Sequence, residues 1–405
     1  MDIKNIKKEF PIFKQKINGK PLIYLDSANS SQKPKVVIDR ISHFYETEFS
    51  NVGRSVHALA VKATNRFETT RDKVQKYLNA NHREEIIFTK GATEAINLVA
   101  SSYGKKYINK GDEILITELE HHSNYVPWNF LRTEKGAVIK FAQVNENGDV
   151  ELDEIKKLIT SKTKIIAITH ISNVTGAVLP ITKIVDLAKE KKIPVLIDGT
   201  QGAPHSEIDM QKIGCDFYAI SCHKMYGPNG LGLLYMKKKW VDDLPPYQGG
   251  GGMINEVKKD EISFADAHTK FEAGTMQTAE VVAFAESLNF IDKLGIKNIA
   301  SHENEILQYG LETLKKNNSV NIIGDPKERG SVLCFTLKDI HPHDIATILD
   351  DDGVAIRAGH HCCQILHDKL GIPATARASI GVYNDKEDID KLSDAIKNCQ
   401  KVFQN

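Results

Sequence analysis

The chain has 405 residues, which exceeds the usual size of a single hydrophobic core and predicts two domains. Its 53 basic residues equal its 53 acidic residues, so no basic field is available for nucleic acid or an anionic membrane. A hydrophobic content of 41% is typical of a folded globular protein.

The N-terminal residues and the cysteines indicate where the protein works. MDIKNIKKEFPIF is charged and contains acids, so it resembles neither a signal peptide nor an acid-poor transit peptide. No apolar run reaches the roughly 18 residues that span a bilayer. The six cysteines have neither CxxC spacing nor a disulfide-like density. We therefore expect a cytoplasmic protein with reduced thiols.

Strands and helices are expected to alternate through the first two thirds of the chain. A short strand and polar loop (24–34) precede a helix from about 36 to 49, a loop containing Arg54 and His57, and a helix that ends near 78. Strands are then expected at 85–91, 112–117, 164–170 and 194–199, with helices at 93–107, 152–159 and 181–192. Continuous apolar strands separated by helices predict an α/β fold with a mostly parallel sheet covered on both faces.

The pattern changes after the four glycines at 249–252. Residues 253–271 are polar and mixed, which fits a hairpin or a long loop. Helices are expected at 280–295 and 299–316. Strands near 320–323, 331–337 and 378–383 and helices near 343–349 and 386–403 then predict a smaller α+β unit. We expect a large domain of residues 22–290 and a small domain of residues 1–21 and 291–405.

One lysine lies in an unusual position. Residues 216–221 read as an apolar strand, and a Gly-Pro-Asn-Gly turn at 227–230 leads to a second apolar strand. Lys224 lies between them, where burial would be costly unless the amine is paired or loses its proton. An amine with a lowered pKa can form a Schiff base with an aldehyde. The alternative is an ordinary exposed lysine in a loop.

Other candidate residues follow the ends of the predicted strands, where ligands bind in open α/β sheets. Thr93 opens a helix and could bind phosphate or simply cap the helix. Asp198 could bind a ligand or cap a loop. His121 and His122 could stack on a ring, bind a metal or be structural. A phosphate site, a carboxylate, an aromatic ring and a Schiff-base lysine together are what pyridoxal phosphate requires.

Nine stretches carry a resemblance that extends over nearly the whole chain. They are YLDSANSSQKP, TKGATEAINLVA, LEHHSNYVPW, HISNVTGAVLP, DGTQGAPH, ISCHKMYGPNGLGLLY, FEAGTMQ, RAGHHC and RASIGVYN. With them the sequence resembles the cysteine desulfurases of the SufS type, in the class V branch of the fold-type I aminotransferases. The resemblance implies a seven-stranded, mostly parallel sheet in the large domain and a catalytic cysteine loop in the small domain.

The resemblance also implies roles for single residues. Lys224 resembles the lysine bound to pyridoxal 5'-phosphate, His121 the histidine stacked on its ring and Asp198 the partner of the pyridine nitrogen. Arg377 resembles the arginine that binds the substrate carboxylate, a task that suits a guanidinium fork. The remaining positions are Gln201 at the phenolic oxygen, Asn173 at the substrate or ring, Thr93, Ser221 and His223 at the phosphate, Thr275 reaching in from a partner subunit, and Arg357 and His57 lining the substrate pocket.

Cys362 resembles the nucleophile that takes sulfur from L-cysteine as a persulfide and leaves L-alanine. Its alternatives are a buried structural thiol or metal binding by the HHCC run, although adjacent extended side chains point to opposite faces and seldom share one ion. His360, His361 and Arg357 are expected to favour the thiolate, which is the attacking form. We expect no bound metal.

The sequence departs from the family pattern at a few positions. They are Gly53 and Ser55 in the loop before the second helix, Ala92 in the phosphate loop, Cys222 beside His223, and Cys363, a second thiol that is either redox-active or a bystander.

The short loop around Cys362 implies a dedicated sulfur acceptor of the SufE or SufU kind, and residues 253–271 resemble a hairpin that lies by the neighbouring active site of a homodimer. The expected function is supply of persulfide sulfur for iron–sulfur cluster assembly. The alternatives are a selenocysteine lyase and a non-catalytic assembly scaffold.

Overall fold

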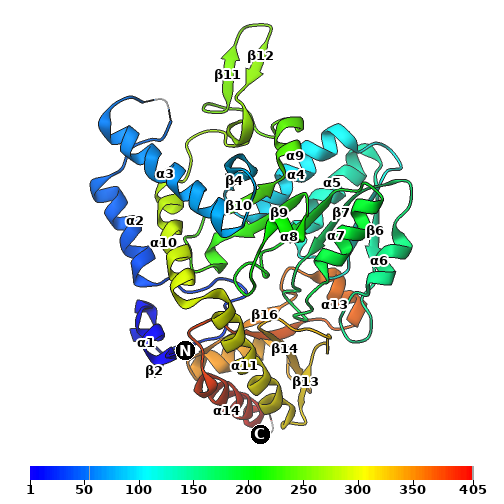
Figure 1. Cartoon of the computed structure of the whole chain (residues 1–405). Helices are drawn as coiled ribbons and strands as arrows, with labels where there is room; N and C mark the ends of the chain where they lie inside the picture. Colours follow the sequence, from blue (N-terminus) through cyan, green and yellow to red (C-terminus); the bar gives the residue numbers. More distant parts are fainter. Residues whose placement is uncertain (54, 404–405) are drawn as a thin grey trace.

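A seven-stranded sheet forms the centre of the computed structural model, which describes residues 1–53 and 55–403 (Figure 1). The spatial order is β4-β10-β9-β8-β7-β5-β6. These strands are β4 (Ile86–Thr89), β5 (Glu113–Thr117), β6 (Val138–Ala142), β7 (Thr163–Thr169), β8 (Val195–Asp198), β9 (Phe217–Ser221) and β10 (Gly232–Met236).

The sheet is mostly parallel, as predicted. Neighbours from β9 to β6 all pair in parallel, whereas β10 pairs antiparallel with both β9 and β4. The exception has a local cause, because β9 and β10 are joined by a short turn rather than by a crossover helix. The other strands are joined by longer connections, most of which contain a helix.

Both faces of the sheet are buried. Along β7, Ile166 and Ile168 belong to one core cluster, whereas Ile165 and Ala167 belong to the other. This alternation puts successive side chains on opposite faces. One face packs against α4 (Ala92–Tyr107) and α5 (Val126–Lys135), and the other against α3 (Ala58–Tyr77), α7 (Ile181–Glu190) and α10 (Thr278–Leu294).

A second, antiparallel sheet follows two long helices. Its order is β13 (Val320–Ile322), β14 (Val332–Leu337), β17 (Thr375–Ser379) and β16 (Arg357–Gly359). A separate core cluster lies between this sheet and α11 (Ile296–Lys315), α12 (Pro342–Asp351) and α14 (Lys386–Val402). The domain limits given above stay a prediction.

The N-terminal segment forms a separate two-stranded sheet beside this second sheet. β3 (Ile23–Tyr24) pairs in parallel with β15 (Val354–Ala355), and Phe10 packs edge-on against Tyr383 and Phe290. The remaining elements are α1 (Ile3–Lys8), β1 (Lys16–Ile17), β2 (Lys20–Pro21), α2 (Lys35–Thr47), α6 (Leu152–Leu158), α8 (Met210–Ile213), α9 (Lys238–Asp243) and α13 (Gln364–Leu370).

Three predictions about elements need correction. The strand expected at 378–383 lies at 375–379, because the Asn384 side chain accepts a hydrogen bond from Gly381 N and closes a turn there. Strand β6 was not expected, since it is a partly exposed edge strand with a mixed pattern. Helix α4 begins at Ala92 with Gly91 as its N-cap, so Thr93 is inside the helix and does not cap it.

The predicted hairpin at 253–271 is formed by β11 (Ile254–Val257) and β12 (Ile262–Phe264) and projects from the body of the protein (Figure 1). Among the described residues, no helix combines the length and apolarity needed to cross a membrane. Arg54, in the loop before α3, lies outside the described residues.

Candidate active site

A cavity of about 230 Å³ lies at the carboxyl ends of the central strands. Thr169 ends β7, Asp198 ends β8 and Ser221 ends β9, and all three line it. This is the place where open α/β sheets bind ligands. The other lining residues are Asn29, Ala92, Thr93, His121, Ser123, Ile171, Asn173, Thr200, Gln201, His223, Lys224, Arg357 and Cys362.

Lys224 ends the short 3-10 turn η4 (Cys222–Lys224) that directly follows β9. Its amine has no hydrogen-bond or ion-pair partner within residues 1–53 and 55–403. Burial, assisted by the nearby charge of Arg377, lowers the pKa of Lys224 from its usual 10.5 to about 8. Roughly a tenth of this amine is therefore uncharged at pH 7, far more than for an ordinary lysine, and the uncharged form attacks an aldehyde.

Asp198 is a buried carboxyl group whose Oδ1 accepts a hydrogen bond from Thr200 N at 3.0 Å. No lysine, arginine or histidine forms an ion pair with it in the described part of the chain. Burial raises the pKa of Asp198 as a result. A cation from a bound ligand would relieve this cost, because a buried carboxylate is stable only when it is paired.

His121 caps the 3-10 turn η3 (His122–Asn124) that follows β5. Its Nδ1 accepts a hydrogen bond from Ser123 N at 3.1 Å, so the ring proton is on Nε2. Burial, together with the charge of Lys224, lowers the pKa of His121 to about 3. The ring is therefore neutral over the whole physiological pH range.

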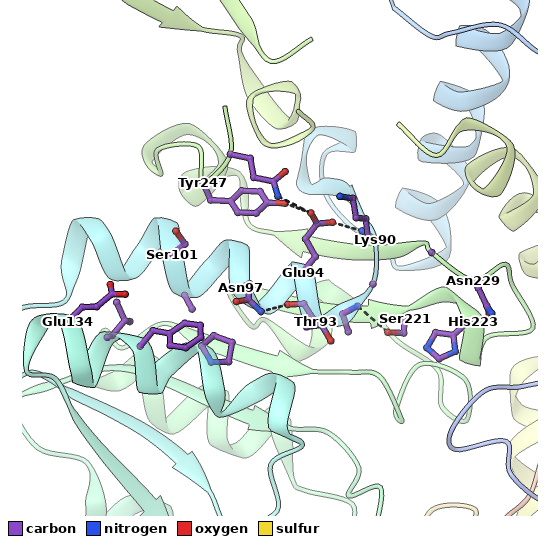
Figure 2. Close-up of a pocket in the computed structure, with 18 residues that line it drawn as sticks. Lys90, Thr93, Glu94, Asn97, Ser101, Glu134, Ser221, His223, Asn229 and Tyr247 are labelled. Atoms are coloured by element: carbon purple, nitrogen blue, oxygen red, sulfur yellow. Dashed lines mark hydrogen bonds between the residues drawn. The ribbon is translucent and has the colours of Figure 1, made fainter. Parts of the chain in front are cut away.

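The first turn of α4 borders the cavity on another side. Ala92 N donates to Ser221 Oγ at 3.0 Å, which ties this helix start to the end of β9. The first amides of a helix have no intrahelical acceptor, so they form an anion site together with the helix dipole. Figure 2 shows Thr93, Ser221 and His223 gathered at this position.

The residues of this helix start also border a second, larger cavity of about 880 Å³ (Figure 2). Ala92, Thr93, Ser221 and His223 line both cavities. The larger one runs between α4 and α5, past Phe130, whose side chain is 52% exposed.

Two arginines lie directly opposite each other on neighbouring strands. Arg357 of β16 pairs in register with Arg377 of β17. Arg377 is buried, donates to Asn173 O at 3.0 Å and Asp26 Oδ1 at 3.3 Å, and keeps an Nε without a partner among the described residues. Burial lowers the pKa of Arg377. Guanidinium groups are the donors that bind carboxylates through paired hydrogen bonds, and one carboxylate, that of Asp26, already bonds to Arg377.

Cys362 lies in the loop between β16 and α13, in a left-handed backbone conformation with φ of 57°. Its carbonyl accepts a hydrogen bond from His122 N at 2.7 Å, and Arg357 Nη2 lies 3.8 Å from its sulfur. Asn173 Nδ2 holds the preceding carbonyl, of His361, at 2.7 Å. The loop is thus held in place with the thiol lining the same cavity as Lys224.

One expectation about this thiol is wrong. His361 cannot supply positive charge to it, because burial lowers the pKa of His361 to about 2 and its Nε2 is hydrogen-bonded to Thr375 Oγ1 at 2.9 Å. Arg357 is the cation that contacts the sulfur. Cys363 is a buried thiol directed at the carbonyls of Leu119 and Glu120, and burial raises its pKa, so it is not primed to react.

Most of the predicted site residues line one cavity, and three do not. Arg377 lies behind Asn173 and beside Arg357. His57 is an exposed N-cap of α3, and Thr275 borders a separate small pocket with Thr89 and Lys90. Sequence reasoning missed Asp26, which binds Arg377, and Asn29, whose Oδ1 accepts from Arg357 at 2.8 Å. Both follow β3, so the rule about strand ends could have found them.

The residues fit pyridoxal phosphate. Within the described residues, the structure offers an amine and a buried carboxyl group that form no ion pair, a neutral histidine ring and a helix start whose first amides lack intrahelical acceptors. Each of these groups is of a chemical type that pyridoxal phosphate requires. Within the described residues, no cluster of three histidine, cysteine or acidic side chains is arranged to hold a metal.

The fold and site define a class of protein, the α/β enzymes with a ligand pocket at the strand ends, and the comparisons define the family. Residues 23–392 match the aminotransferase class-V family. The chain belongs to this family, as predicted.

Full-length relatives carry a more specific name. A probable cysteine desulfurase of Halalkalibacterium halodurans is 43% identical, over 100% of this chain and 99% of that protein. Another probable cysteine desulfurase, of Staphylococcus epidermidis, is 46% identical over 99% of this chain and 98% of that protein. A crystal structure of an Escherichia coli cysteine desulfurase superposes with a TM-score of 0.92 at 34% identity and covers 99% of both chains.

Proposed function

We propose that the chain is a pyridoxal-phosphate-dependent cysteine desulfurase, which converts L-cysteine to L-alanine and keeps the sulfur as a persulfide on Cys362. One observation carries this proposal: the Lys224 amine and the Cys362 thiol line a single cavity. The class-V family and the desulfurase relatives support the same reaction. When bound, pyridoxal phosphate withdraws electrons from the substrate α-carbon.

The chain's own residues divide the work of binding this cofactor. Lys224 would hold it covalently, and the Asp198 carboxylate would pair with its pyridine nitrogen. The neutral His121 ring would lie against it, Gln201 and Asn173 would hydrogen-bond to it, and the start of α4 would bind its phosphate with Thr93, Ser221 and His223. The Gln201 side chain is held in place, because its Nε2 donates to Ala28 O at 2.7 Å and keeps a second N–H for a ligand.

Substrate binding and sulfur transfer fall to the arginine pair and the thiol. Arg377 and Arg357 bind the substrate carboxylate. The Lys224 amine would take the α-proton, and Arg357 Nη2, 3.8 Å from the Cys362 sulfur, places positive charge beside the attacking atom. The thiolate forms a bond to the substrate sulfur, the carbon–sulfur bond breaks, and its electrons return to the carbon skeleton. Protonation of that skeleton yields alanine.

The persulfide must then leave the site through an acceptor. The Cys362 loop comprises only residues 360–363 between β16 and α13. A loop this short cannot carry the sulfur far, which supports a dedicated acceptor protein of the SufE or SufU kind and a role in iron–sulfur cluster assembly. The six free cysteines fit the predicted cytoplasmic location.

We also propose that the protein is a homodimer. Exposed apolar side chains lie on the hairpin, at Val257, Ile262 and Phe264, and beside the larger cavity, at Phe130. Thr275 is outside the cavity of its own chain, so its proposed contact with the phosphate requires a second copy. His57, the exposed N-cap of α3, also lies outside this cavity, so its proposed place at a substrate pocket would be in the partner subunit.

Two variants test the proposed function. Lys224→Ala should lose the near-visible absorbance of the bound cofactor and all alanine formation. Cys362→Ala should keep the absorbance but lose more than about a hundredfold in cysteine turnover, as for a nucleophile. Liquid chromatography measures the alanine, and peptide mass spectrometry measures a 32 Da sulfur addition, the mass of one sulfur atom.

Cys363→Ala is the matched control and should keep wild-type turnover, because its thiol points away from the cavity. Alanine release from L-cysteine without added sulfur on the Cys362 peptide would contradict the nucleophile assignment. Wild-type protein that turns over L-selenocysteine but not L-cysteine would indicate the lyase instead.

A further inference from the structure

The loop between β3 and α2 contacts three parts of the proposed site. Asp26 binds Arg377 and Asn29 binds Arg357, through the hydrogen bonds given above. At the other end of the loop, Lys33 reaches the turn that carries Lys224. One short segment, residues 26–33, therefore joins both arginines to the catalytic amine.

Four donors of this segment converge on one carbonyl oxygen, that of His223. Ser31 donates through N at 3.1 Å and Oγ at 3.0 Å, and Ser30 Oγ lies at 3.3 Å. Lys33 Nζ makes the shortest contact, at 2.7 Å. A carbonyl oxygen has two lone pairs, so these four donors share it, and the shortest contact is that of Lys33. The next residue in the chain is Lys224.

Lys33 itself is in a costly position. Its remaining contacts are Ser31 O at 2.5 Å and Ser30 Oγ at 3.4 Å, and no carboxylate forms an ion pair with it in the described residues. The titratable groups recorded beside it are the buried thiol of Cys222 and the imidazole of His223. Burial lowers the pKa of Lys33 to about 7. An apolar residue would avoid this cost, so stability alone does not explain a lysine here.

We propose that Lys33 is a positioning residue for Lys224: its side chain fixes the His223–Lys224 peptide and so aims the Lys224 amine into the cavity. This inference rests on the proposed function, because it assigns Lys33 to the cofactor lysine. The contact is charge-assisted when Lys33 is protonated and weaker when it is neutral. The benefit from Lys33 is therefore larger at pH 6 than at pH 8.5.

The rate at which the cofactor-free full-length chain captures pyridoxal phosphate tests this. Near-visible absorbance follows capture, and borohydride reduction with peptide mass spectrometry identifies the lysine. We expect Lys33→Met to slow capture on Lys224 about tenfold at pH 6, the factor for one charge-assisted hydrogen bond, and clearly less at pH 8.5. Lys33→Arg should capture the cofactor at nearly the wild-type rate, because it keeps a positive charge at this position. Lys35→Met, at an exposed neighbour, is the control.

The outcomes separate the two hypotheses. Wild-type chain that captures no cofactor on Lys224 overturns the proposed function. Two results would overturn the role of Lys33 when the wild-type chain captures the cofactor normally. In the first, Lys33→Met captures it at the wild-type rate. In the second, Lys33→Met slows capture by the same factor at pH 6 and at pH 8.5. If the methionine variant does not fold, Lys33→Gln replaces it, and the same contrast between pH 6 and pH 8.5 is expected.

Discussion

At the scale of single residues, the site contains two buried ionisable groups that form no ion pair within the described residues. The Lys224 amine makes no hydrogen bond there, and Asp198 has the Lys224 charge nearby without bonding to it. Each group costs folding free energy until a ligand pairs with it. Function and stability are therefore opposed at these positions, and removal of one such group should stabilise the cofactor-free protein.

Lys224→Met tests this opposition through pH. The folded pKa of Lys224, about 8, is below its unfolded value near 10.5, so the unfolded chain binds more protons between these values. Wild-type stability thus rises with pH from 8 to 10.5, and the destabilisation is fully present below pH 8. We expect the variant to be more stable by roughly 2 kcal/mol at pH 7, after allowance for partial exposure, and the gap to narrow by pH 10.

Urea unfolding of the cofactor-free proteins at pH 7 and pH 10 measures this difference. Lys183→Met, at an exposed position of α7, should show the same small change at both pH values. A stability gap for Lys224→Met that does not depend on pH would mean that the amine is not desolvated in the folded chain.

At the scale of elements, the phosphate site depends on a close approach of two backbones. A Cβ atom added at Gly232 of β10 would lie 2.4 Å from Gly91 Cα, which is the N-cap of α4. Only a residue without a side chain allows β10 to pass so near the start of this helix. The geometry of the proposed anion site is thus set by a strand that does not itself line the cavity.

Gly232→Ala should displace the start of α4. The added methyl group meets backbone that cannot rotate away, so we expect a loss of roughly 1–3 kcal/mol in unfolding free energy and weaker binding of the cofactor phosphate. Urea unfolding and equilibrium binding of pyridoxal phosphate give the two quantities. Gly249→Ala is the control, because nothing lies within 4 Å of its added atom. Unchanged phosphate binding in Gly232→Ala would show that α4 does not depend on this approach.

At the scale of the whole molecule, the proposed dimer covers surface that a single chain leaves open. Phe130 is 52% exposed beside the cavity that shares Thr93 and Ser221 with the cofactor pocket. A second copy in this place would close the phosphate end of the site and bury the Phe130 ring. Cofactor retention and dimer formation should then be linked.

Phe130→Glu should weaken the dimer, because it buries an unpaired charge in the interface. We expect the dissociation constant to rise at least about tenfold, with faster loss of the cofactor from the diluted protein. Analytical ultracentrifugation over a concentration series measures the first effect and absorbance the second. Phe403→Glu, equally exposed near the end of α14, should change neither. A wild-type monomer at all concentrations would exclude the dimer.

Much of the fold followed from the sequence, because local patterns specify it. The apolar strands around 87, 115, 166, 196 and 219 are each buried on both faces, and continuous apolar runs indicate such strands directly. Four site residues could be found because each lies at or after a strand end: Lys224, Asp198, Thr93 and His121. The edge strand β6 could not be predicted, because it is partly exposed and has a mixed pattern. The position of β17 could not be predicted, because a hydrogen bond to the Asn384 side chain closes the turn that follows it.

The sequence by itself determined the alternation of strands and helices, the family and the chemical types of residue present. Only the tertiary structure decided that Lys224 and Cys362, far apart along the chain, share a cavity, that His361 is neutral, and that Lys33 contacts the turn before Lys224. The physical reason is that a pKa and a contact depend on neighbours from distant segments. The sequence does not state which distant residues become neighbours, whereas burial and charge act through space on whatever lies nearby.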